Sequence, residues 1–143
     1  MKDKIRNGSV CFLTYDLGFG GAEKVIVTLA NELSLSGRDI SIAMLGTQND
    51  FKNILSPNIQ IIPLNCENIK YSPLTLLNFF YKNSFENLVA NLWPITTLSF
   101  LVKLIKPQTN FVIIEHCELS EQFKNKGAFF KKILQLSIKT FHT

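Results

Sequence analysis

Apolar and polar positions along the chain form alternating blocks that predict β/α units. Short continuous apolar runs predict strands at 10–14, 40–45, 59–64, 87–92 and 111–115. Apolar residues at helical spacing predict helices at 22–36, 74–82, 94–105 and 128–143. Because the strands are continuous apolar runs, they indicate a parallel sheet covered on both faces. Right-handed crossovers then give one α/β domain with a Rossmann-like, doubly wound sheet, in which the first strand is central.

Pro73 would start the helix predicted over 74–82. We expect Leu74, Leu77, Phe80 and Tyr81 to point inward.

The segment from Asp16 to Lys24 joins the first strand to the first helix through a glycine-rich turn. Gly20 and Gly21 stand at the expected helix N-terminus, where unpaired N–H groups and the helix dipole favour an anion. Glycines also let a ligand come close to the backbone, because no Cβ stands in the way. The residues alone leave two interpretations open: a phosphate-bearing ligand over Gly20 and Gly21, or a tight turn without a ligand.

Known phosphate-binding motifs narrow the choice of ligand. A dinucleotide fingerprint needs a third glycine, which would fall at Glu23, and an acid after the second strand, where Gly46 and Thr47 stand. No G-K-[ST] follows the glycines, as it would in an ATPase P-loop, and no G-x-S-x-G elbow is present. The sequence therefore predicts no nicotinamide, flavin or other cofactor.

The composition is that of a single globular domain. Of 143 residues, 46% are hydrophobic and 18% are charged. The 3 cysteines form no C-x-x-C pair and only 2 histidines are present, so the sequence predicts no metal site. The odd number of cysteines and the lack of a signal peptide favour a reducing cytoplasm.

The net charge of +4 arises largely from lysines late in the chain. In the segment 124–141 these lysines accompany an apolar, aromatic helical arc, which predicts contact with an anionic membrane surface. An ordinary helix with its apolar face on the sheet is the alternative. No nucleic-acid-binding motif accompanies the charge, so we expect no nucleic-acid partner.

Three short motifs follow one another in an order that resembles a known family. They are GGAEKV at 20–25, LANEL at 29–33 and GRDI at 37–40. Together they resemble the N-terminal domain of retaining GT-B-fold glycosyltransferases, the family 4-like group. In that group a glycine pair precedes Ala-Glu-Arg/Lys-Val, and the helix ends at a glycine before a strand. The resemblance is strong over 10–45, fair over 87–120 and weak over 46–86.

The resemblance implies a function for the chain and roles for particular residues. Residues 1–143 would be the acceptor-side half of an enzyme that transfers a hexose from a nucleotide diphosphate sugar to a growing glycan or lipid-linked acceptor. Gly20 and Gly21 would contact the donor phosphate or the acceptor, and Trp93 would bind substrate. His116 would be catalytic, because a histidine can donate a proton to a hydroxyl or leaving oxygen. Core packing of Trp93 and a purely structural His116 are the alternatives.

The resemblance also implies a second domain, because such enzymes bind the donor mainly through a C-terminal domain that is absent here. We therefore expect the isolated chain to be inactive alone and to need the missing half as a partner. We expect a cytoplasmic location, peripheral on the inner face of the cell membrane. The alternative function is a non-catalytic nucleotide- or partner-binding Rossmann-like module, or an inactive remnant.

Overall fold

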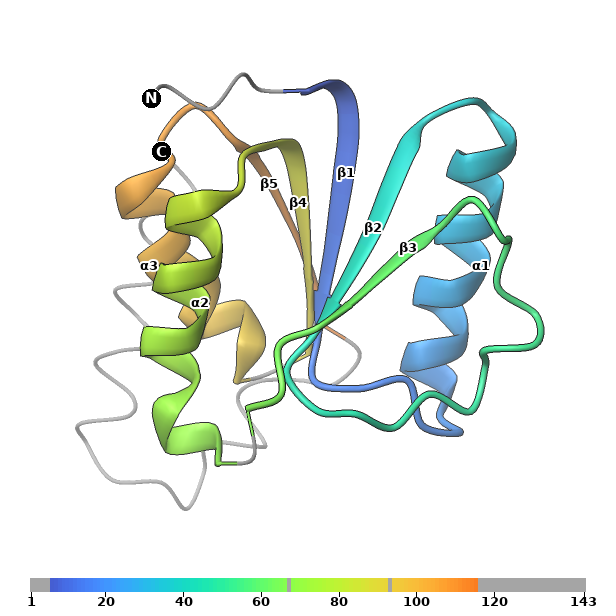
Figure 1. Ribbon diagram of the computed structural model, residues 1–143, viewed down its shortest axis with the longest axis horizontal. Coiled ribbons are helices and arrows are strands. Elements are labelled where there is room, and N and C mark those ends of the chain that lie inside the picture. Colours follow the sequence, from blue (N-terminus) through green and yellow to red (C-terminus); the bar gives the residue numbers. More distant parts are fainter. Residues whose placement is uncertain (1–5, 67, 93, 116–143) are drawn as a thin grey trace.

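The structure, a computed structural model, describes residues 6–66, 68–92 and 94–115. Within these ranges the chain forms one α/β domain around a 5-stranded parallel sheet in the order β3-β2-β1-β4-β5 (Figure 1). The strands are β1 (Arg6–Thr14), β2 (Asp39–Met44), β3 (Gln60–Pro63), β4 (Phe85–Asn91) and β5 (Asn110–Ile114). Both the Rossmann-like sheet and its central first strand are as predicted.

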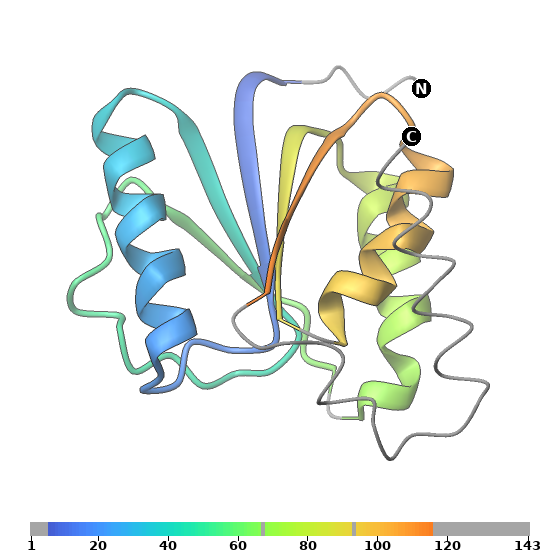
Figure 2. The same ribbon diagram turned by 180° about the vertical axis from the view of Figure 1, so that it is seen from behind.

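Helices cover both faces of the sheet, as a doubly wound fold requires. Helix α1 (Gly21–Leu35) lies on one face, and α2 (Ser72–Lys82) and α3 (Ile95–Ile105) lie on the other (Figures 1 and 2). The short 3₁₀ turn η1 (Ile69–Tyr71) leads into α2. The chain moves outward from β1 to β3 and then crosses back to β4, so right-handed crossovers place the later helices on the opposite face.

Alternate residues of β1 divide the core into two layers. Val10 and Phe12 belong to the apolar cluster beneath α1, whereas Cys11 and Leu13 belong to the cluster beneath α2 and α3. Complete burial raises the pKa of the Cys11 thiol to about 12. Cys11 therefore packs as a small apolar group, as its place in a core strand predicts.

Helix α1 ends at Leu35, and Gly37 lies in the turn that follows. Gly37 has a φ of +83°, a left-handed conformation that a glycine adopts without a Cβ clash. The Gly37 N–H donates to the Ser34 carbonyl at 3.0 Å and the Arg38 N–H donates to the Leu33 carbonyl at 3.1 Å. This pair of bonds is a Schellman motif, which satisfies the last carbonyls of the helix and turns the chain into β2.

Helix α2 is rotated relative to the expectation from the sequence. Its buried stripe is Ser72, Leu76 and Phe80, at intervals of four residues. Of the four residues expected to point inward, Phe80 is 2% exposed as predicted and Leu77 is partly buried, whereas Leu74 and Tyr81 are 70% and 76% exposed. The difference arises because apolar residues occupy both sides of this helix, so spacing alone did not fix its rotation.

None of the helices in the described ranges has both the length and the apolar character needed to cross a membrane. The segment 124–141, which carries the predicted membrane contact, lies outside the described residues.

Candidate functional site

The glycine pair lies where the sequence predicts, at the carboxyl edge of the sheet. Gly20 is the N-cap of α1, with an extended backbone (φ −141°, ψ 160°), and Gly21 is the first residue of the helix. In Figure 1 this junction lies at the lower edge of the molecule, where β1 runs into α1. Ligands of doubly wound sheets bind at this edge, outside the carboxyl ends of the strands.

The turn between β1 and α1 is held against the segment that follows β2. Leu17 and Asn49 form an isolated parallel bridge. The Leu17 N–H donates to the Gln48 carbonyl and the Asp50 N–H donates to the Leu17 carbonyl, both at 2.9 Å. Because Leu17 is fully buried, these bonds fix the turn in place before any ligand is bound.

Carboxylates of the chain itself surround this turn. The Gly18 N–H donates to Asp16 Oδ1 at 3.1 Å, and the Phe19 N–H donates to Asp50 Oδ2 at 3.1 Å. The Glu23 side chain folds back towards Gly20, where a Cβ would overlap its carboxylate. An acid in the first turn complements the positive end of the helix dipole. The N-terminus of α1 is therefore already close to a negative charge.

The two glycines differ in what surrounds them. A Cβ on Gly20 would have to displace the Glu23 carboxylate, which is the far end of a flexible side chain. A Cβ on Gly21 would meet nothing within 4 Å. Packing of the described residues therefore does not require a glycine at position 21, and this part of the backbone is open to solvent or to a ligand.

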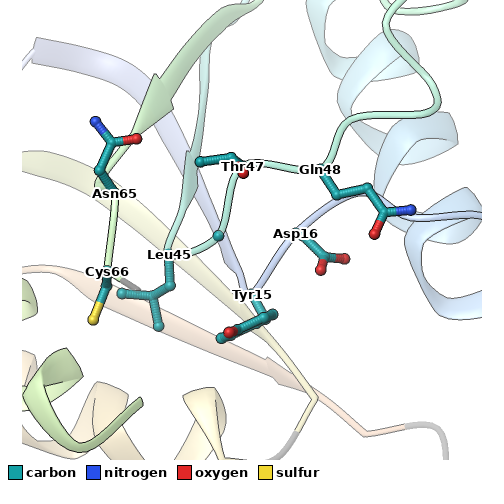
Figure 3. Close-up of a pocket in the computed structure, with 8 residues that line it drawn as sticks. Tyr15, Asp16, Leu45, Thr47, Gln48, Asn65 and Cys66 are labelled. Carbon is teal, nitrogen blue, oxygen red and sulfur yellow. The ribbon is translucent and has the colours of Figure 1, made fainter. Parts of the chain in front are cut away.

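A cavity of about 450 Å³ opens beside the turn (Figure 3). It is lined by Tyr15 and Asp16 after β1, by residues 45–48 after β2, and by Asn65 and Cys66 after β3. Figure 3 shows Asp16 and Gln48 on the side of α1, and Asn65 and Cys66 on the side of β3. The volume of this cavity falls in the range of roughly 300–1,000 Å³ that is common for small-molecule sites.

Backbone contacts between the strand ends shape this cavity. The Gly46 N–H donates to the Tyr15 carbonyl at 2.6 Å, and a Cβ on Gly46 would lie 3.2 Å from that oxygen. Glycine thus allows the loops after β1 and β2 to approach closely. On the other side, Asn65 has a left-handed φ of 50°, and the Cys66 N–H donates to the Leu45 carbonyl at 2.7 Å. Strained residues of this kind are found often at ligand sites.

Sequence reasoning did not identify Thr47, Gln48 and Asn65 as site residues. A usable signal was present, because Asn65 comes directly after an apolar strand and Thr47 and Gln48 follow another within three residues. In a parallel sheet such positions share one edge.

The structure locates only part of the predicted site. Gly20 and Gly21 lie together at the carboxyl edge, whereas Trp93 and His116 lie outside the described residues. Their roles therefore stay predictions. Glu115, after β5, accepts a hydrogen bond from the Thr96 hydroxyl of α3. Within the described residues, no group of three or more His, Cys, Asp or Glu side chains is arranged to hold a metal ion.

No protein-family model matches the chain, and a search of curated proteins returns no significant match.

Proposed function

We propose that this domain is the N-terminal, acceptor-side half of a retaining glycosyltransferase. The intact enzyme would transfer a hexose from a nucleotide diphosphate sugar to a growing glycan or lipid-linked acceptor. One observation carries the proposal: a GGAE motif opens the first helix of a β3-β2-β1-β4-β5 parallel sheet, beside a cavity at the same edge. The resemblance of the sequence at 10–45 to the glycosyltransferase family supports it.

The proposal divides the work between two domains. The C-terminal domain would grip the nucleotide sugar, and this domain would position the acceptor across the cleft between them. Holding two substrates in register converts an encounter in solution into a reaction within one complex. His116 is proposed as the group that donates a hydrogen bond or a proton to the sugar or the acceptor. No nucleophile from this chain is proposed, because retention by same-face attack needs none.

The proposed acceptor side also fits a place beside the membrane. Lipid-linked acceptors are anchored in a bilayer, and the segment 124–141 combines lysines with aromatic and aliphatic residues. Such a segment binds an anionic surface through its charges and its apolar side. We propose that this segment brings the domain to the inner face of the cell membrane.

A non-catalytic binding module is the second candidate function. Exposed apolar side chains favour it, since Phe19 is 82% exposed and Tyr71 is 65% exposed. Exposed apolar side chains of this size are typical of surfaces that bind partners. This candidate predicts a stable complex with another protein and no turnover of any sugar donor.

The test is a transfer assay with and without a C-terminal, donor-binding domain. The chain is purified alone and together with a separately expressed C-terminal, donor-binding domain, and each sample is mixed with UDP- and GDP-hexoses and glycan acceptors. We expect transfer only from the pair, and a loss of roughly 10²-fold or more in turnover for His116→Ala. Absence of transfer by the pair with every donor would contradict the glycosyltransferase proposal, and near wild-type turnover of His116→Ala would remove His116 from the site.

A further inference from the structure

We propose that the cavity beside the glycine turn binds the hydroxyl groups of a neutral saccharide rather than the phosphate groups of a nucleotide. The glycine pair by itself suggests a phosphate site. The side chains around it point to a different ligand.

Two backbone N–H donors of the turn are already occupied by carboxylates of the chain. The N–H groups of Gly18 and Phe19 are already bonded to the carboxylates of Asp16 and Asp50, each at 3.1 Å. Asp50 Oδ2 also accepts from Gln48 Nε2 at 2.6 Å. A phosphate that binds the N–H groups of Gly18 and Phe19 would have to displace these carboxylates. It would also meet their negative charge.

The described lining of the cavity carries a negative charge. Among the described residues that line it, Asp16 is acidic and none is Lys, Arg or His. Phosphate sites in proteins are typically built from basic side chains or from unpaired N–H groups. Basic side chains are missing from the described lining, and Glu23 adds a further carboxylate over Gly20. The local electrostatics therefore oppose a phosphate.

The lining of the cavity offers hydrogen-bond acceptors, hydrogen-bond donors and an aromatic surface. A carboxylate has about four acceptor positions, and the described hydrogen bonds of the Asp16 side chain use one of them. Thr47 and Asn65 are exposed and carry groups that both donate and accept. The Tyr15 side chain is 41% exposed and provides an aromatic surface. Hydroxyl groups need this mixture of acceptors and donors, and the C–H face of a sugar ring can pack on an aromatic ring.

Backbone contacts make the walls of the cavity rigid. The Gly46–Tyr15 contact, the Leu17–Asn49 bridge and the left-handed Asn65 hold the cavity walls through the backbone. A site formed in advance loses less entropy when a ligand binds. This matters for a neutral saccharide, because it offers no charge to drive association.

The inference rests on the proposed function only for the role of the ligand, which would be the acceptor sugar of the transfer reaction. Binding itself is measurable on the chain alone, without any transfer reaction. A negative result for saccharide binding would leave the transfer assay undecided, and a negative transfer assay would leave the binding result standing.

The experiment combines ligand-observed saturation transfer with protein-observed amide shifts, both on the full chain. The probes are the methyl glycosides of glucose, galactose, mannose and N-acetylglucosamine, with UDP and pyrophosphate as phosphate-bearing probes. We expect saturation transfer to at least one glycoside, and none to UDP or pyrophosphate. Amide shifts on titration with that glycoside should include residues 15–16, 46–48 and 65.

Two variants locate the binding. Asp16→Asn keeps an oxygen that can accept from the Gly18 N–H but loses the charge, and we expect saccharide affinity to fall roughly tenfold or more. Thr47→Val removes an exposed hydroxyl and should also weaken binding without unfolding the chain. Glu32→Gln removes the same charge from an exposed site on α1 and should leave affinity unchanged. Binding of UDP or pyrophosphate in this cavity, binding of no glycoside, or equal affinity of Asp16→Asn and Glu32→Gln would each overturn the inference.

Discussion

The Glu23 carboxylate lies in the space that a side chain on Gly20 would occupy, directly over the start of α1. The glycine therefore makes room for an acid of the chain's own first helical turn. This acid complements the positive end of the helix dipole, and it also competes with any anion for the same place.

Removing the charge of Glu23 should reduce stability. We expect Glu23→Gln to lower the free energy of unfolding by about 0.3–1 kcal/mol at low ionic strength, and by less in high salt. Urea denaturation at two salt concentrations measures this change. Glu32→Gln is the matched control, because Glu32 lies in the last turn of α1 and opposes the dipole there. The hypothesis is wrong if both variants lose the same stability.

The glycines of the first β/α unit should respond differently to alanine. Gly21 is helical and a Cβ there meets nothing within 4 Å, so Gly21→Ala should raise the free energy of unfolding by about 0.4–1 kcal/mol. Gly37 has a φ of +83°, so Gly37→Ala should lower that free energy by about 1–2 kcal/mol. Thermal or urea unfolding of the two variants gives the comparison. Destabilisation by Gly21→Ala would show that position 21 has a packing role.

The rotation of α2 gives a further prediction. Leu76 is 0% exposed and Leu74 is 70% exposed, although both are leucines in the same helix. We expect Leu76→Ala to lower the free energy of unfolding by about 2–5 kcal/mol and Leu74→Ala to change it by less than about 0.5 kcal/mol. Equal losses in denaturant unfolding would mean that Leu74 is buried as well, which would contradict this orientation of α2.

The fold was predictable because its signals are local. Continuous apolar runs such as 40–45 identify parallel strands, and the apolar spacing of 22–36 identifies α1. The boundaries were less certain. β1 begins at Arg6 rather than at Val10, because backbone pairing of Arg6 with Phe85 does not need an apolar side chain.

The site was predictable only where a single segment carries it. Gly20 and Gly21 belong to one motif, so sequence sufficed to place them at the start of α1. The bond from the Phe19 N–H to Asp50 spans 31 residues, and the cavity joins three separate loops. Such contacts depend on how the strands are ordered in the sheet, which no local pattern encodes. The prediction of which face of α2 is buried failed for a related reason, because Leu74 and Leu76 are equally apolar.

Burial of Cys11 predicts a loss of stability at high pH. Its pKa is raised from 9.0 to about 12, so the unfolded chain loses the proton near pH 9 while the folded chain keeps it. The stabilisation is complete below pH 9 and is lost as the pH rises from about 9 to about 12, by roughly 1.4 kcal/mol per pH unit. Urea unfolding at pH 8 and pH 10 should show a smaller decline for Cys11→Ala than for the native chain. Identical declines would contradict the buried thiol.

The segment 124–141 should bind anionic lipid in preference to neutral lipid. Each lysine near such a surface contributes roughly 1 kcal/mol, so a double variant with Lys131→Glu and Lys132→Glu should lose at least about 2 kcal/mol, or roughly 30-fold in partitioning. Flotation with phosphatidylserine vesicles and with phosphatidylcholine vesicles measures this. The matched control reverses two exposed lysines of the described domain, Lys52→Glu and Lys70→Glu, which changes the net charge equally. If the two double variants float alike, the attraction comes from overall charge and not from this segment. If the native chain binds both lipids equally or binds neither, the segment has no role at an anionic membrane.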